Sequence, residues 1–433
     1  MSTDTMTKEI IMHRKQVMKV AAILMMVVIP LVSNAGPREM AKRIHDRLAG
    51  VPPTEAVLDA MEACINDRNS AGCTAGGGNP ALSNDGAVVA AYIAMNNASF
   101  YNVTLKNFAA PWTNEAQSRF VPLNDYTATV IGMIRDDVDF RGILSADILY
   151  VGGTTTPAYS NSSNAHYLAM ENSGADLNTE LVQRLQSAVT GMATANTAGA
   201  VTTRAAARAF FIDGTSRAMF RFTLINHLCT DIEPLKDNTR PADRIRQDVS
   251  RSPGGDSRIY MNSCIGCHAG MDPLMQAYAY YDWNYPANQP DNGQLVFDST
   301  SRAVDPNDAS KGTTRARPKF LINASNFPYG YVTRDNSWTN YWRNGPNAIL
   351  GWSGGPSSGQ GAKSMGQELA NSSAFASCQV RKVFKTVCLR DPMDSAADRT
   401  RINSIVASFG GGAINMKRVF GETASYCKDG SKY

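Results

Sequence analysis

The sequence predicts a mainly α-helical fold with long irregular loops and few short strands. Two observations carry this prediction. Apolar residues recur at helical spacing in many separate segments, and stretches rich in Gly, Pro, Asn and Ser lie between those segments. Hydrophobic residues make up 43% of the 433-residue chain and charged residues 18%. This balance is typical of a globular protein with a sizeable core, and it excludes a wholly disordered chain.

Residues 1–35 are predicted to be a cleaved signal peptide. An apolar run at 21–32 follows a basic flank and is followed by three small residues at 33–35. The basic flank consists of His13, Arg14, Lys15 and Lys19. The apolar run is too short to cross a hydrocarbon core of about 30 Å as a helix. We therefore expect export, cleavage and no stable membrane anchor in the mature chain.

Residues 36–200 are predicted to form an N-terminal helical domain. Helical spacing over residues 39–65 is interrupted at Pro52 and Pro53, which predicts two helices joined by a proline turn. The same spacing predicts three more helices, at residues 87–95, 126–134 and 177–192. The Gly-, Ser- and Thr-rich composition predicts loops at residues 76–80 and 152–164.

The rest of the chain divides into residues 201–290 and residues 291–433. The first part opens with a predicted helix at 204–228. The second part is predicted to be loop-rich, with short strands around 295–297 and 320–322. A long helix is then predicted at 364–387, with Ser364 as its cap.

The basic and acidic residues are mixed along the chain. The formal net charge is +4, and Lys and Arg form no long block. Nucleic-acid binding normally needs a clustered basic face, so this distribution predicts no nucleic-acid partner.

A Cys-x-x-Cys-His motif at Cys264, Cys267 and His268 is the strongest chemical signal in the sequence. In a c-type haem the two thiols add across the haem vinyl groups as thioethers, and the following histidine is an axial ligand of the iron. Bare Cys-x-x-Cys pairs also serve zinc or thiol redox chemistry, but the second ligand pair or the βαβ pattern that these need is not visible. The sequence therefore predicts one covalently attached haem c, in a cytochrome c-like domain over 201–290 that residues 291–433 complete.

The second axial ligand of the iron is predicted less directly. Among the side chains, Met365 is the leading prediction, because it lies far enough from the motif for its thioether to reach the opposite face of a porphyrin. His227, His45 and His166 are alternatives, and so is an iron whose sixth position holds water or stays open. An arginine is also expected to pair with the haem propionates, and four lie near the motif in sequence: Arg244, Arg246, Arg251 and Arg258.

Six cysteines remain outside the motif, an even number that fits disulfides in an oxidising compartment. Cys64 and Cys73 enclose a short segment rich in turn-forming residues, which favours a bond between them. The other four can pair in three ways, and the sequence does not choose among these. They are Cys229, Cys378, Cys388 and Cys427.

The segment from Cys264 to Pro273, followed by residues 277–282, resembles the haem segment of the planctomycete-type c cytochromes. Further stretches resemble the same family in the same order: 47–53, 136–151, 164–169, 215–229 and 368–387. The chain departs from the family in its extra cysteines and in a Trp- and Asn-rich block at 323–352. The resemblance implies an exported haem protein with largely helical domains, and it implies no substrate.

The function predicted from these observations is electron transfer by an exported monohaem c-type cytochrome, in the periplasm or outside the cell. It needs a redox partner protein, and a homo-oligomer is compatible with it. We expect an electron carrier rather than an enzyme. Two alternatives remain: a haem peroxidase or oxygenase with an open iron position, and a secreted assembly or binding module in which haem is structural.

Overall fold

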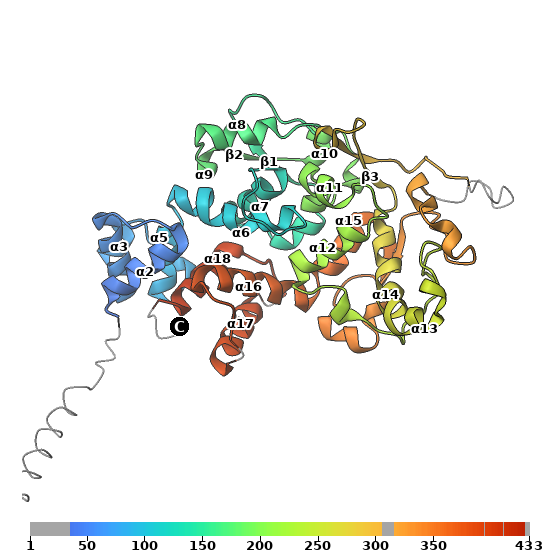
Figure 1. Cartoon of the computed structure of the whole chain (residues 1–433). Coiled ribbons are helices and arrows are strands. Elements are labelled where there is room, and N and C mark those ends of the chain that lie inside the picture. The colour runs from blue at the N-terminus through green and yellow to red at the C-terminus, as the bar shows by residue number, and fades with distance from the viewer. Residues whose placement is uncertain (1–34, 305–315, 394, 410, 429–433) are drawn as a thin grey trace, which may run out of the picture.

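The computed structural model describes residues 35–304, 316–393, 395–409 and 411–428. The predicted signal peptide lies outside these residues, except for its last position. Helices dominate the described chain, and its strands form three small two-stranded antiparallel sheets (Figure 1). The predicted mainly α-helical fold with few short strands is confirmed.

The longer helices belong to two sets, one in each half of the sequence. The first set is α2 (Pro37–Ala49), α3 (Glu55–Asn66), α5 (Gly86–Ala94), α7 (Asp125–Arg135), α8 (Ala165–Ser173) and α11 (Arg204–Phe210). The second set is α12 (Arg217–Leu228), α14 (Ile265–Met275), α15 (Gly361–Ala370), α16 (Ser373–Cys388), α17 (Ala396–Ser408) and α18 (Met416–Tyr426). Short helices between them are α4 (Ala71–Ala75), α6 (Lys106–Ala109), α9 (Leu177–Glu180), α10 (Gln186–Thr190) and α13 (Ser257–Ile259).

Each sheet is a pair of short strands. Strand β1 (Leu149–Gly152) pairs with β2 (Leu181–Arg184), and β3 (Tyr281–Asn284) pairs with β4 (Gln294–Phe297). Strand β5 (Ser337–Thr339) pairs with β6 (Ser358–Gln360). The predicted strand around 295–297 is confirmed.

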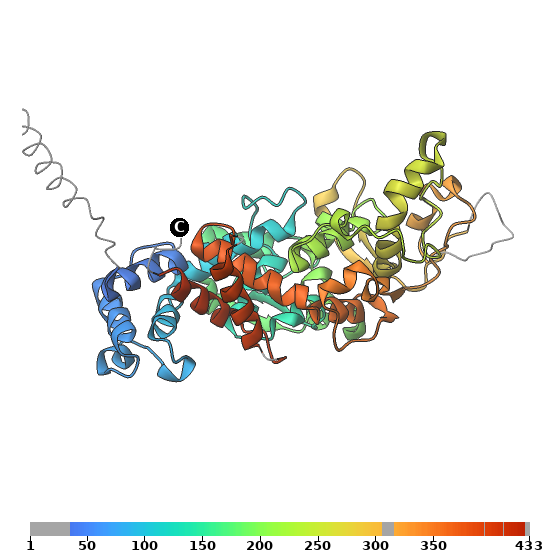
Figure 2. The ribbon, with the colours of Figure 1, turned by 90° about the horizontal axis from the view of Figure 1, so that it is seen from below.

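The two ends of the described chain pack against each other. Helix α18 packs on α5 and α2, and α16 packs on α18 and on α12 (Figures 1 and 2). Helix α5 is apolar on nearly every side, as expected for a helix covered all round. One hydrophobic core contains residues from 36–200, 201–290 and 291–433 alike. The three predicted segments therefore share their interior.

Three disulfides are present, and they include the predicted bond between Cys64 and Cys73. A second bond joins Cys229, at the end of α12, to Cys378 in α16. A third joins Cys388, at the end of α16, to Cys427 after α18. These bonds indicate an oxidising compartment, and they resolve the pairing that the sequence left undecided.

Most predicted helices are confirmed, including the pair around Pro52 and Pro53 and the helices near 87–95 and 126–134. The single helix predicted at 177–192 is wrong, because β2 interrupts it by pairing with β1. The helix predicted at 204–228 is two helices, separated by a bend in which Asp213 and Ser216 have positive φ.

Two further predictions fail in the C-terminal part. Residues 318–321 form a 3-10 turn instead of a strand around 320–322. The predicted helix 364–387 is two helices, α15 and α16. Ser364 lies inside the first of these, while Ser372 caps the second by accepting a hydrogen bond from the backbone N–H of Phe375.

Candidate haem-attachment site

Cys264, Cys267 and His268 lie on one continuous helical stretch. It begins with α13, widens into a π-helical turn at Tyr260–Cys264, and continues as α14. Single π-turns inside helices occur frequently at functional sites. Cys264 and Cys267 are three residues apart on this stretch, so their side chains lie on neighbouring positions of one helix face. Both are free thiols and both are partly exposed.

The segment from Lys236 to Asn238 packs against the turn that carries the two cysteines. The backbone N–H of Asp237 donates to the carbonyl of Gly266 over 3.1 Å, and the Lys236 ammonium donates to the carbonyl of Asn262. A Cβ at position 266 would come within 2.2 Å of the Asn238 amide oxygen. Gly266 therefore allows this close approach.

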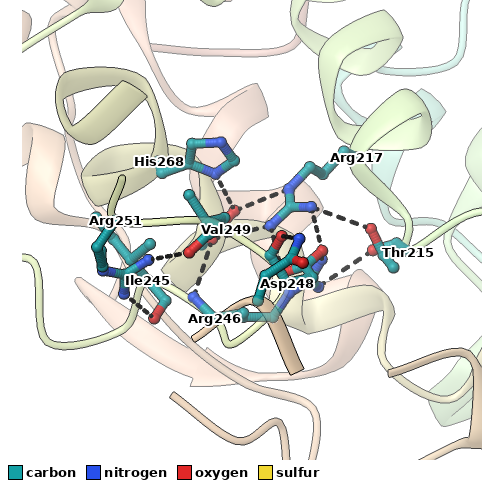
Figure 3. Close-up of polar contacts among 10 residues, drawn as sticks. Thr215, Arg217, Ile245, Arg246, Asp248, Val249, Arg251 and His268 are labelled. Carbon is teal, nitrogen blue, oxygen red and sulfur yellow. Dashed lines mark hydrogen bonds and ion pairs between the residues drawn. The ribbon is translucent and has the colours of Figure 1, made fainter. Parts of the chain in front are cut away.

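His268 is bonded to a buried carboxylate one helical turn further on. Its ring Nδ1 lies 3.1 Å from Oδ1 of Asp272, whose side chain is fully buried. An ionised carboxylate only accepts hydrogen bonds, so Nδ1 carries the proton, and in the neutral imidazole Nε2 is then the nitrogen with a free lone pair. Figure 3 shows this second nitrogen on the side of the His268 ring away from the dashed hydrogen bond. A metal-bound histidine almost always donates its other N–H in this way.

Two arginines hold the carboxylate in place (Figure 3). Arg217 makes two hydrogen bonds to Asp272, at 3.2 and 3.1 Å, and also pairs with Asp248. Arg246 donates its backbone N–H to Asp272 over 3.3 Å and its guanidinium to Asp248 over 3.4 Å. The carbonyl of Thr215 accepts a further bond from Arg246. We call Arg217, Arg246, Asp248 and Asp272 the carboxylate network.

The electrostatics keep Asp272 ionised. Burial is the largest single influence and would raise the pKa of this carboxyl, but the Arg217 guanidinium, the hydrogen bond from His268 and the Arg246 guanidinium together outweigh it and hold that pKa well below its ordinary value. The pKa of Asp248 is also lowered: burial opposes the charged form, but the hydrogen bonds from Arg217 and the positive charges of Arg246 and Arg217 together outweigh burial. Both carboxylates are therefore anionic at neutral pH.

The Cys267 thiol lacks the signature of a reactive redox cysteine. Burial raises the pKa of the Cys267 thiol, whereas nucleophilic cysteines have a lowered pKa. In the part of the chain that the structure describes, no three His, Cys, Asp or Glu side chains gather as a metal-binding group.

The residues at the motif fit a covalently held haem. The two thiols are unpaired and share a helix face, and Nε2 of His268 has no hydrogen-bond partner within the described chain. Ile259 and Met261, directly before the cysteines, expose 45% and 54% of their surface. A porphyrin beside the cysteines would give such apolar side chains a surface to pack against.

The structure places Met365 in α15, where it is fully buried in the main core. Helix α15 packs on the turn Gln276–Tyr278, which continues α14 beyond its C-terminal end. That turn begins eight residues after His268, more than two turns of helix. Met365 as the second axial ligand stays a prediction.

The alternative histidines are engaged elsewhere. His45 bonds to the carbonyl of Val51, and both ring nitrogens of His166 bond to backbone groups. His227 is fully buried between Trp112 and Phe375, and its Nε2 lies 2.7 Å from the Tyr126 hydroxyl. Each of the three therefore has a role in the core.

The four arginines predicted as propionate partners all have partners in the chain. Arg246 belongs to the carboxylate network, and Arg258 pairs with Asp256 at the surface. Arg244 donates to the carbonyl of Ser337. Arg251 donates to the carbonyls of Val249 and Ile245, and its guanidinium lies over the rings of Tyr260 and Phe327.

Sequence reasoning missed Asp272 as a site residue, although a local signal was present. Asp272 lies four positions after His268, and residues at that spacing are neighbours on a helix. The contact from Arg217, 55 residues earlier in the chain, leaves no such local signal.

No protein-family model, no curated protein and no solved structure matches this chain. The resemblance to the planctomycete-type c cytochromes therefore stays a prediction that rests on the residues quoted above.

Proposed function

We propose that this chain is an exported monohaem c-type cytochrome that acts in electron transfer. The observation that carries the proposal is the hydrogen bond from Nδ1 of His268 to the buried Asp272. His268 directly follows the second of two free thiols in the sequence. That bond leaves Nε2 as the ligand nitrogen, and the thiols supply the thioether bonds by adding S–H across two vinyl groups. A bound haem would supply one-electron exchange between ferric and ferrous iron.

The residues of the chain have distinct tasks in this proposal. Cys264 and Cys267 fix the porphyrin edge to the helix, and His268 orients its ring through Asp272. Both cysteines are partly exposed, so a haem held by them would be accessible to a redox partner protein. Three disulfides support an oxidising compartment, and the periplasm or the cell exterior is the proposed location. None of the described helices combines the length and the apolar composition that a membrane-spanning helix needs.

The test is covalent haem content after production in a periplasm equipped for haem attachment. We expect the denatured chain to keep one haem by mass and to give the reduced pyridine spectrum of a c-type haem. The double variant C264A/C267A should lose both. The matched control C64S/C73S also removes two cysteines, but these form a remote disulfide, so haem should remain. A colourless wild-type chain with free thiols at 264 and 267 would refute the proposal.

A haem peroxidase or oxygenase is the second candidate, because a carboxylate bonded to the axial histidine also suits an iron that activates peroxide. Carbon monoxide added to the reduced protein separates the two. Electron transfer with a bound Met365 thioether predicts little carbon monoxide binding and a spectral change in M365A. Rapid binding, with an unchanged spectrum in M365A, would favour the peroxidase or oxygenase and reject Met365 as ligand.

A further inference from the structure

We propose that Asp272 sets a low reduction potential at this site, because its buried carboxylate strengthens the electron donation of His268 to the iron. This inference rests on the proposed function. It adds that the potential is set by one named residue, and that the physiological electron donor has to be a correspondingly strong reductant.

The first step is the strength of the bond at Nδ1. A hydrogen bond to a charged acceptor is roughly twice as strong as one between neutral groups. The acceptor here is a carboxylate whose side chain is fully buried, so water does not compete for it. His268 Nδ1–H is therefore partly drawn toward Asp272, and the ring becomes more basic at Nε2.

The second step is the rigidity of the acceptor. Asp272 accepts from His268, from two nitrogens of Arg217 and from the backbone N–H of Arg246. These contacts come from three separate segments, so the carboxylate cannot swing away when the charge on the iron changes. The carboxylate therefore stays beside Nδ1 in both oxidation states.

The third step is the sign of the effect. A more basic Nε2 stabilises ferric iron more than ferrous iron, because ferric iron carries one more positive charge. The carboxylate network contains two guanidinium groups and two carboxylates, so it is formally neutral. The predicted shift therefore comes through the hydrogen bond to His268 and not through a net field.

The experiment compares D272N with D248N. Both replace one carboxylate of the network by an amide of the same shape, but Asp248 pairs with Arg217 and Arg246 without contacting His268. In D272N we expect the equilibrium for reduction to shift roughly tenfold or more toward ferrous iron, which is about 59 mV upward for one electron. In D248N we expect less than a third of that shift.

Resonance Raman provides a second readout that does not depend on D272N. The iron–histidine stretching frequency is observed in five-coordinate ferrous haem, so it is measured in reduced M365A, which lacks the predicted sixth ligand. There it should be high, as for a histidine bonded to a carboxylate. It should fall when D272N is added to M365A and stay when D248N is added. This measurement remains decisive if D272N does not fold.

The two proposals fail in different ways. A chain without covalent haem would refute the proposed function. Haem that is attached, with a potential shift in D272N no larger than in D248N, would overturn only the role of Asp272. A low iron–histidine frequency in M365A, where Asp272 is still present, would do the same.

Discussion

Several buried carboxylates of the described chain are held by an arginine side chain together with other donors. Asp272 is one case, and Asp398 in α17 is a second case far from the motif. Asp398 accepts two hydrogen bonds from Arg390, one from the Tyr426 hydroxyl and one from the backbone N–H of Met393. The bonds from Arg390 lower the pKa of Asp398, and they outweigh burial, which acts in the opposite direction.

We expect D398N to lower the free energy of unfolding by about 3 kcal/mol at pH 7, since it leaves a buried guanidinium with a weaker partner. A carboxyl with a lowered pKa in the folded state stabilises the protein above the ordinary pKa of 3.8 and loses this contribution as pH falls through the folded pKa. The difference between wild type and D398N should therefore shrink below about pH 4. Urea unfolding of both proteins at pH 7 and at lower pH measures this difference in the free energy of unfolding.

The control for this prediction is D391N. Asp391 also pairs with a cation, Lys385, but 73% of its side chain is exposed, so its loss should have almost no effect. Equal losses of stability in D391N and D398N would contradict the importance assigned to burial.

At the scale of elements, disulfides join α16 to the ends of two of the helices on which it packs, α12 and α18. The bond from Cys229 to Cys378 closes a sequence separation of 149 residues and ties α16 to α12, which also packs on α14. The bond from Cys64 to Cys73 closes a separation of only 9 residues. In the chain-entropy account, a cross-link stabilises mainly by restricting the unfolded chain, and the effect grows with the length of the loop.

The double variant C229S/C378S should therefore lose more stability than C64S/C73S. The loop-length relation gives a difference of about 2.5 kcal/mol between the two bonds at 25 °C. Denaturant unfolding of the wild type and of both variants measures the free energy of unfolding that each variant loses. A larger loss in C64S/C73S would show that local strain or packing, and not loop closure, dominates.

At the scale of the whole molecule, the helices of the first and last parts of the chain share one interior. Residues from Ala41 to Cys427 belong to a single hydrophobic core, and α18 packs on α5 and α2. Residues on both sides of the predicted boundaries at positions 200 and 290 therefore pack in the same core. An isolated segment would expose the apolar surface that its neighbours now cover.

We expect the mature chain to unfold in one cooperative transition, because each of the predicted segments loses its covered surface when another unfolds. Three of the five tryptophans lie in residues 291–433, so tryptophan fluorescence reports mainly on that part, while far-UV circular dichroism reports on all helices. The two denaturation curves should coincide. Separate midpoints would show that residues 291–433 fold as their own unit.

The sequence by itself determined the features that depend on near neighbours. Helical spacing and prolines predicted α2, α3, α5 and α7, and the short interval between Cys64 and Cys73 predicted their bond. The residues of the motif could be named for the same reason, since Cys264, Cys267 and His268 lie within one turn and a half of helix.

Only the tertiary structure decided what depends on distant residues. Residues 181–184 became a strand because β1 offers a partner, and the pairs Cys229–Cys378 and Cys388–Cys427 follow from helix packing. The contact of Arg217 with Asp272 joins residues 55 positions apart. The sequence contains many arginines, and nothing local in it indicates which one pairs with Asp272. Local patterns restrict a chain over a few residues, whereas the choice among distant partners is made by the core that brings them together.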